Sequence, residues 1–520
     1  MSRADPLHRR FFVGTLSNLL GQGVIVITSL AILPIIVHRV GATDYGIWIL
    51  IVSVANFIFV LDIGISAGLV KYVAEHVARS EYDEGARLVG AATWLYALLG
   101  IGACVVGLVL ALVLPDLLGM HGHTRRVVPA VVALTALGAG ISIPSVAPLA
   151  VLRGLQRFSL VNGIAAGGAV LTAGLTIGAL MLGGGIVGVA AATTVSALIT
   201  FAISVGVIRR VAPELTRRLV RPDRQRARRL LRFSSSLAIV QIAGRLQTRT
   251  DAVVIGAALP VRLVAPYNFA QRLAEGTRLT TEQFVKVVLP VAAEIGVTRD
   301  QAALRGLFLT ATRLSLAITL AVALPLILLG GSILSLWVGS QFGKYGDLVA
   351  ILAASAVFDL VAWPAASVLQ GVERHPPLAW MALGDGVLNV ILSIALVGVF
   401  GLMGVALATL VATVGETMLF VLPYTARTLG ISLADLGREV LARLAVPAAA
   451  FTAILVATSS SLPLTSFPPL VAVLGVAIAG YALAYVAVGA GPRERDAYRL
   501  AASSVIRLMR SPSGRRSRQL

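Results

Sequence analysis

Two apolar stretches in the middle of the chain contain charged residues: SSSLAIVQIAGRLQTRTDAVVIGAAL at 234–259 and VAPYNFAQRLAEGTRLTTEQFVKVVLP at 264–290. Each is long enough to cross a bilayer as a helix, because about 20 apolar residues span the hydrocarbon. A charge at the bilayer centre costs about 2.5–3.5 kcal/mol on insertion scales. We therefore expect these charged side chains to face a water-filled cavity or to pair with one another. They are Arg245, Arg249, Asp251, Arg272, Glu275, Arg278 and Glu282.

The composition is that of a protein whose solvent is lipid. Of 520 residues, 57% are hydrophobic and 13% are charged, and the mean hydropathy is +0.90. A soluble domain has about 25% charged residues. The sequence therefore predicts an all-α polytopic membrane protein. Cys104 is the only cysteine, so one chain can form neither a disulfide nor a cysteine-based metal site.

Fourteen stretches are long and apolar enough to span a membrane, and the two charged stretches are among them. The first stretch is too long for the apolar region of a signal peptide, so we expect it to be an uncleaved first span. The predicted spans lie near residues 11–37, 45–73, 88–114, 127–152, 160–182, 186–208, 233–259, 264–290, 307–333, 348–370, 378–400, 402–424, 444–462 and 469–490.

The distribution of Lys and Arg between alternate loops predicts the orientation. With a cytoplasmic N-terminus, 33 of the 43 basic residues fall in cytoplasmic segments, five in outer loops and five within spans. Cytoplasmic loops carry the excess of basic residues in helical membrane proteins. We therefore expect both termini to be cytoplasmic in the cell membrane. The net charge of +19 then reflects topology and attraction to anionic lipid, and we expect no nucleic-acid partner.

A repeated segment divides the chain. GIVGVAAATTV at 185–195 matches GLMGVALATLV at 401–411 in seven of eleven positions, 216 residues apart. Because six spans per copy is an even number, we predict two six-helix lobes related by a pseudo-two-fold axis along the membrane normal. The predicted parts are an N-terminal lobe at 1–208, a basic cytoplasmic linker at 209–232, a C-terminal lobe at 233–425, two additional helices at 426–490 and a basic cytoplasmic tail at 491–520.

Several short motifs, taken in order, resemble those of the polysaccharide biosynthesis (O-antigen flippase) family over spans one to twelve. Four lie near the N-terminus, one follows the fourth span and one follows the ninth. They are Asn18, Leu33-Pro34, Val40-Gly41-Ala42-Thr43-Asp44-Tyr45-Gly46, Asp62-Ile63-Gly64 with Ala67, Gly154-Leu155-Gln156-Arg157-Phe158, and Leu336-Trp337-Val338-Gly339.

The resemblance implies a fold and a function. That family shares a superfamily of two six-helix lobes with the multidrug and toxin extruders and the lipid II flippases. It implies that a polyprenyl-(pyro)phosphate-linked oligosaccharide is flipped to the outer leaflet by alternating access. It also implies a cationic central cavity and, in many members, a proton or Na⁺ gradient as the driver. Candidate partners are the lipid-linked oligosaccharide, the bilayer, and a polysaccharide polymerase or glycosyltransferases.

Within each charged span, polar residues recur every three or four positions and therefore share one helical face. An Arg guanidinium is a planar, always-charged donor that suits phosphate oxygens. Such a face is a candidate binding site for an anionic lipid headgroup. The alternative is that the basic and acidic residues neutralise one another as buried ion pairs. The candidate headgroup residues are Gln241, Arg245, Arg249, Arg272, Glu275 and Arg278.

Carboxyl groups inside spans are candidates for coupling transport to an ion gradient, because desolvation favours binding of a proton or a cation. The alternative role is a local hydrogen bond or an ion pair with a neighbouring Arg. Asp385 in the eleventh span is a further carboxyl of this kind. The candidate ion-coupling residues are Asp62, Asp251, Asp359 and Glu416.

Two other functions are compatible with a chain of many spans. A cation-coupled multidrug or toxin extruder would have acidic rather than arginine-rich cavity walls. A polysaccharide polymerase or ligase would need a large outer domain or loop, and the predicted outer loops are short. The six His residues form no catalytic or metal-binding pattern, and no GxxxxGK phosphate-binding loop occurs. We therefore expect a flippase rather than an enzyme, with no metal site.

Overall fold

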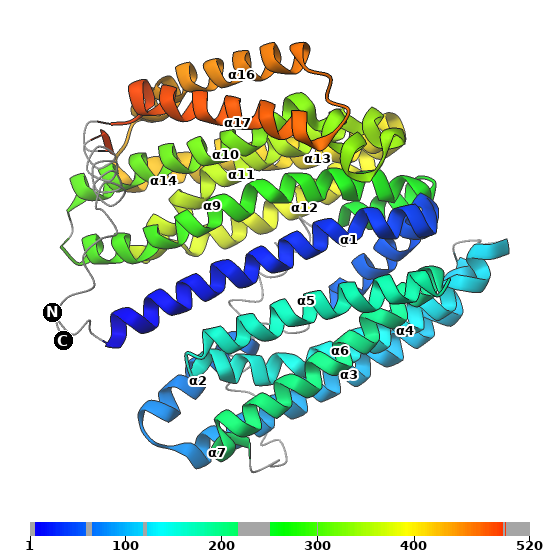
Figure 1. Ribbon diagram of the computed structural model, residues 1–520. Coiled ribbons are helices and arrows are strands. Elements are labelled where there is room, and N and C mark those ends of the chain that lie inside the picture. The colour runs from blue at the N-terminus through cyan, green and yellow to red at the C-terminus, as the bar shows by residue number, and fades with distance from the viewer. Residues whose placement is uncertain are drawn as a thin grey trace, which may run out of the picture. The chain divides into compact units, whose positions relative to one another are not determined.

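The computed structural model describes residues 6–58, 65–117, 122–216, 250–298, 300–491 and 494–495. Within these ranges the chain is helical and contains no β-strand (Figure 1). Eleven helical segments in these ranges are long and apolar enough to cross a membrane. The chain is therefore a multi-pass helical membrane protein, as its composition predicts.

The helices follow one another with short connections. In the first half of the chain they are α1 (Pro6–Ile58), α2 (Ile65–Ala78), α3 (Tyr82–Leu117), α4 (Gly122–Gly154), α5 (Phe158–Met181), α6 (Gly185–Val211) and α7 (Pro213–Thr216). In the second half they are η2 (Val261–Leu263), α9 (Val264–Thr298), α10 (Gln301–Val338), η3 (Ser340–Tyr345), α11 (Gly346–Gly371), α12 (Pro376–Phe400), α13 (Leu402–Gly415), η4 (Glu416–Val421), α14 (Leu422–Leu429), α15 (Leu433–Leu436), η5 (Gly437–Ala442), α16 (Arg443–Ser461), α17 (Phe467–Ala484) and η6 (Tyr485–Gly489).

These helices agree with the predicted spans. Spans three to six and nine to fourteen each coincide with one helix or with consecutive helical segments. The first predicted span lies within α1. The second predicted span covers the C-terminal part of α1 and much of α2. The eighth span is α9, and residues 250–258 form the described part of the seventh. Within the described ranges the prediction of an all-α membrane protein is confirmed, and the eleven apolar helical segments there, which do not include α9, are compatible with about fourteen spans in the chain.

The chain divides into two compact units. Unit 1 comprises Met1–Arg272, Trp337–Leu348 and Pro376–Glu416, and unit 2 comprises Leu273–Leu336, Val349–His375 and Thr417–Leu520. In unit 1, α3 packs along α4, α4 along α6, and α12 along α13. In unit 2, α16 packs along α17. The predicted division into two lobes is a separate, sequence-based hypothesis and stays a prediction.

Small residues allow close helix contact within unit 1. A Cβ atom added to Gly100 or Gly107 of α3 would overlap atoms of α4. Such close approach is how helices associate in lipid, where packing rather than the hydrophobic effect holds them together. Other faces of the helices expose large apolar side chains. On α3 these include Ile101, Val105 and Leu112. Exposed rows of this kind are expected where the surrounding solvent is lipid.

Arg313 is a charge within a spanning helix whose partners lie in the same unit. Its side chain is 5% exposed and pairs with the carboxylates of Glu439 and Glu494. It also donates a hydrogen bond of 3.1 Å to the backbone carbonyl of Glu439. Glu439 precedes α16 and Glu494 follows α17. Because breaking a buried ion pair costs about 3–5 kcal/mol, Arg313 fixes this helix pair to α10 and is structural.

Gly41 interrupts α1 between the first two predicted spans. Its φ of 82° and ψ of 165° are non-helical, so two helices meet at this residue. This backbone conformation is essentially restricted to glycine. No atom lies within 4 Å of the place where a Cβ would be added, so the requirement for glycine is conformational and not steric.

Gly41→Ala should therefore destabilise the protein by about 1–3 kcal/mol through backbone strain alone. Gly23→Ala is the matched control, because Gly23 lies in the same helix and also has open space around a Cβ. Its helical conformation predicts a stabilisation of about 0.5–1 kcal/mol. Thermal unfolding of the purified variants in detergent measures both effects. Equal stabilities of the two variants would contradict the assigned break.

Candidate functional site

Arg278 of α9 and Asp359 of α11 form an ion pair. The distance from Arg278 Nη2 to Asp359 Oδ2 is 2.9 Å, and the two side chains are 30% and 14% exposed. Trp363 Nε1, one turn further along α11, donates a hydrogen bond of 3.4 Å to Asp359 Oδ1. The structure thus brings together one candidate headgroup residue and one candidate ion-coupling residue. Both lie in unit 2.

The other predicted site residues are distributed along several segments. Arg272 and Glu275 are half-buried on α9, and Glu416 is half-buried at the first position of η4, a π-helical segment. Glu282 pairs with Lys286 at 2.8 Å on the more exposed part of α9. The remaining candidates lie outside the described residues, and their roles stay predictions. They are Gln241, Arg245, Arg249 and Asp62.

Asp251 is the centre of a buried polar cluster in unit 1. Its side chain is buried, with the residue 2% exposed. Tyr267 donates a hydrogen bond of 2.7 Å to Asp251 Oδ2, and the Thr409 hydroxyl lies 3.5 Å from the same oxygen. Among the described residues, Asp251 Oδ1 has no hydrogen-bond partner. This carboxylate therefore retains an unused acceptor in a site shielded from lipid and water.

Helix α12 adds further oxygen atoms to this cluster. Asp385 and Asn389 are both buried, and Asp385 is close enough to Asp251 to interact electrostatically with it. Asn389 Nδ2 donates a hydrogen bond of 3.0 Å to Thr409 Oγ1. The cluster thus combines two carboxylates, an amide and hydroxyls, which are the hard oxygen donors that suit a small cation or a proton. No group of three His, Cys, Asp or Glu residues with metal-binding geometry occurs in the described ranges.

An aromatic cluster joins distant segments of unit 1. Ring centroids lie 5.3 Å apart for Tyr45 and Phe269, and 5.0 Å apart for Phe269 and Phe342. Trp48 and Trp337 extend the cluster at centroid distances of 5.8 Å from Tyr45 and 6.4 Å from Phe269. Offset and edge-to-face pairs of this kind each contribute about 0.5–1.5 kcal/mol beyond the burial of their area. The aromatic cluster therefore stabilises this packing of α1, α9 and the segment after α10.

Hydrogen bonds reinforce the aromatic cluster. Tyr45 donates to Asn268 Oδ1 at 2.9 Å, and Trp337 Nε1 donates to the carbonyl of Leu30 at 3.0 Å. Gly46 packs directly against Val261, because an added Cβ would overlap the Val261 carbonyl oxygen. Two of the sequence motifs, at 40–46 and 336–339, thus meet at one place although almost 300 residues separate them.

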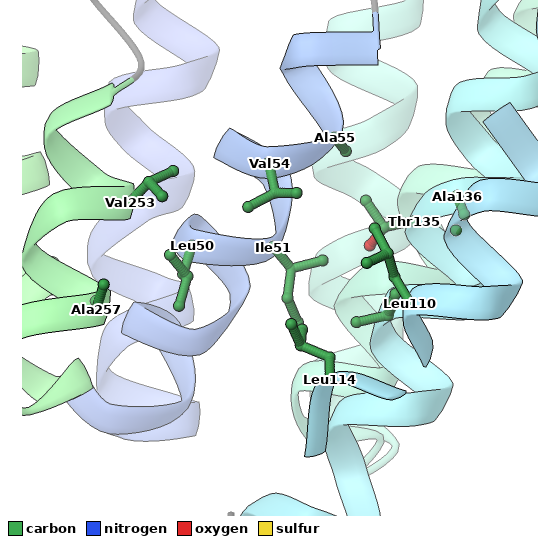
Figure 2. Close-up of a pocket in the computed structure, with 13 residues that line it drawn as sticks. Leu50, Ile51, Val54, Ala55, Leu110, Leu114, Thr135, Ala136, Val253 and Ala257 are labelled. Carbon is green, nitrogen blue, oxygen red and sulfur yellow. The ribbon is translucent and has the colours of Figure 1, made fainter. Parts of the chain in front are cut away.

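An apolar cavity of about 160 Å³ lies in unit 1 between α1, α3, α4 and residues 250–258 (Figure 2). Leu50 and Ile51 of α1 face it, with Val253 and Ala257 on one side and Leu110 on the other. Thr135 contributes a hydroxyl group, and the remaining lining is apolar. An anionic headgroup would lose its solvation in such surroundings, so this cavity is not suited to the phosphate end of a lipid.

The comparisons with known proteins agree with the fold and the motifs. The model of a family described as polysaccharide biosynthesis protein matches residues 11–296. The chain belongs to this family. A probable low-salt glycan biosynthesis flippase of Haloferax volcanii is 23% identical over 241 residues, which cover 46% of this chain and 51% of that protein. The chain thus spans about half the length of this curated relative.

Solved structures show the same fold. The lipid II flippase MurJ in an inward closed conformation has a TM-score of 0.70 at 12% identity, covering 91% of this chain and 99% of that chain. An inward-facing MATE multidrug resistance transporter of the MOP superfamily has a TM-score of 0.63 at 18% identity. The match covers 80% of this chain and 94% of that chain. A MOP superfamily transporter from Pyrococcus furiosus has a TM-score of 0.58 at 20% identity. The match covers 84% of this chain and 97% of that chain. These relatives are named as flippases and transporters.

The sequence analysis did not single out three residues of the polar cluster around Asp251, namely Tyr267, Asn389 and Thr409. A partial signal was present, because Asn389 follows Asp385 by four positions and therefore shares its helical face. Tyr267 and Thr409 look like ordinary residues of apolar spans. Only the packing of residues 250–258 with α12 and α13 reveals their contact with a carboxylate.

Proposed function

We propose that this member of the polysaccharide biosynthesis family is a flippase for a polyprenyl-(pyro)phosphate-linked oligosaccharide. It carries the lipid from the cytoplasmic to the outer leaflet of the cell membrane, with both of its own termini cytoplasmic, for cell-surface polysaccharide synthesis. The observation that carries the proposal is Arg278, a half-buried cation on α9, the predicted eighth span of a chain from this family. The flippase named among its relatives supports the same activity.

The headgroup dictates the chemistry of the site. A phosphate or pyrophosphate cannot cross the hydrocarbon without partners for its charge. Arg offers a rigid fork of N–H donors that matches phosphate geometry. Arg278, with Arg245, Arg249 and Arg272 as further candidates, provides such partners along two consecutive spans. The oligosaccharide and the headgroup would thus cross beside a polar helix face while the prenyl chain stays in lipid.

The polar cluster around Asp251 is the proposed coupling site. Its buried oxygen atoms can bind a proton or Na⁺ that enters from outside and leaves inside. A membrane potential of 100 mV moves one charge with about 2.3 kcal/mol of work, which can bias the direction of transport. Within the part of the chain that the structure describes, Asp251 Oδ1 has no hydrogen-bond partner and could therefore contact such a cation.

Alternating access assigns a role to the aromatic cluster. By the predicted topology, the loops at residues 38–44, 259–263 and 338–346 are on the outer side. The aromatic cluster gathers residues next to all three loops, so in the proposed cycle it would close the outer end of the transport path. Release of the substrate to the outer leaflet would then require these rings to separate.

Arg278→Gln should reduce flipping by at least about tenfold, since a hydrogen bond to a charged group contributes about 1.5–3 kcal/mol. The measurement uses liposomes that contain the purified protein and a fluorescent polyprenyl-pyrophosphate disaccharide, whose outer-leaflet fraction is bleached by dithionite. Arg126→Gln, at an exposed position, is the matched control and should flip like the wild type. Flipping by Arg278→Gln at the wild-type rate would contradict the headgroup role. Transport of cationic drugs without any flipping would favour an extruder, which the MATE-like fold also allows.

Asp251→Asn should abolish the dependence of flipping on an imposed Na⁺ or proton gradient. Asn keeps the size of the side chain and can still accept the hydrogen bond from Tyr267, so the local fold should be retained. Asp83→Asn, at an exposed position in the first turn of α3, is the control and should keep the wild-type gradient dependence. Gradient-driven flipping that persists in Asp251→Asn would remove Asp251 from the coupling site.

A further inference from the structure

The ion pair between Arg278 and Asp359 is more accessible than the ion pair that Arg313 forms with Glu494. Arg313 and its partner Glu494 are 5% and 12% exposed, and Arg313 has a second carboxylate and a backbone carbonyl as partners. The Arg278 side chain is 30% exposed, six times as much. An anionic ligand can therefore approach the Arg278 guanidinium, whereas that of Arg313 is enclosed by its own chain.

Asp359 occupies the position that a ligand phosphate would take. A carboxylate and a phosphate present their oxygen atoms to a guanidinium in the same forked geometry. The Nη2 atom of Arg278 already lies 2.9 Å from Asp359 Oδ2. A phosphate that forms hydrogen bonds with this guanidinium must either share it with the Asp359 carboxylate or displace that carboxylate. Two anions at one arginine also repel each other in surroundings of low dielectric constant.

We propose that Asp359 is an internal counterion that competes with the substrate's phosphate for Arg278 and so sets the affinity of the headgroup site. This inference rests on the proposed flippase function. Without substrate, the Asp359 carboxylate neutralises the charge of Arg278, so α9 does not carry an unpaired charge in the membrane. With substrate, the phosphate replaces Asp359, and the carboxylate returns to Arg278 when the substrate leaves. Binding is thereby kept weak enough for release.

Trp363 is a second partner of the Asp359 carboxylate, beside Arg278. Its indole N–H lies 3.4 Å from Asp359 Oδ1, the oxygen that is not closest to Arg278. When Arg278 turns to the phosphate, this donor continues to solvate the carboxylate. A hydrogen bond to a carboxylate that has lost its cationic partner is stronger than one to a neutralised carboxylate, so Trp363 stabilises the displaced state more than the paired state. Trp363 is in this sense a positioning residue for Asp359.

The test measures binding of farnesyl pyrophosphate to the full-length protein in detergent by isothermal titration calorimetry. Asp359→Asn should bind about tenfold more tightly than the wild type, because the competing charge is gone. Arg278→Gln should bind about tenfold more weakly. The double variant should match Arg278→Gln, since Asp359 acts only through Arg278. Asp359→Glu retains the charge and should stay close to the wild type.

Trp363→Phe provides a second, milder variant in case the loss of Asp359 prevents folding. It keeps the ring and removes the N–H donor, so binding should weaken by about two- to fivefold. An unchanged affinity of folded Asp359→Asn, or of Trp363→Phe where Asp359→Asn does not fold, would overturn the competition. So would a double variant that keeps the gain of Asp359→Asn. If neither the wild type nor any variant binds the probe, the proposed headgroup site itself fails and the competition fails with it.

Discussion

The free energy of placing a charge in hydrocarbon is the constraint on which this structure depends. At roughly 2.5–3.5 kcal/mol per residue, several charges in adjacent spans would offset much of a protein's net stability if they lacked partners. The charged side chains in the described ranges are compensated by partners of three kinds. Arg313 is enclosed by carboxylates at the ends of a helix pair, Arg278 has a partly accessible carboxylate, and Asp251 has neutral donors around it. Each solution corresponds to a different role.

The same constraint separates structure from function. A fully enclosed ion pair such as that of Arg313 can fix helices, but it cannot exchange its partner during transport. The accessible pair at Arg278 can exchange its partner and is therefore suited to a moving anionic ligand. Among the described residues, Asp251 has an unused acceptor and only neutral hydrogen-bond donors, so it can take up a small cation without breaking an ion pair. Anion binding and cation coupling would thus use different residues in one protein.

Hydropathy predicts the fold well because it acts over many residues. Hydropathy places fourteen spans, of which the described helices match eleven directly, and the first two meet at Gly41. The charged face of α9 was also predictable, since its spacing is local. The partners were not. The Arg278–Asp359 pair joins residues 81 positions apart, and Tyr45 donates to Asn268 across 223 positions. Such contacts depend on which helices pack together, and periodicity within one helix contains no information about this.

The central claim is that the protein moves a lipid-linked oligosaccharide outward. The most direct measurement is the leaflet distribution of that lipid in cells of the source organism depleted of the protein, determined with a membrane-impermeant reagent that modifies the sugar. The account predicts that intact lipid-linked oligosaccharide accumulates and faces the cytoplasm, so that it is protected in intact cells and modified after permeabilisation. Outward-facing lipid at its normal level, with no accumulation inside, would contradict it.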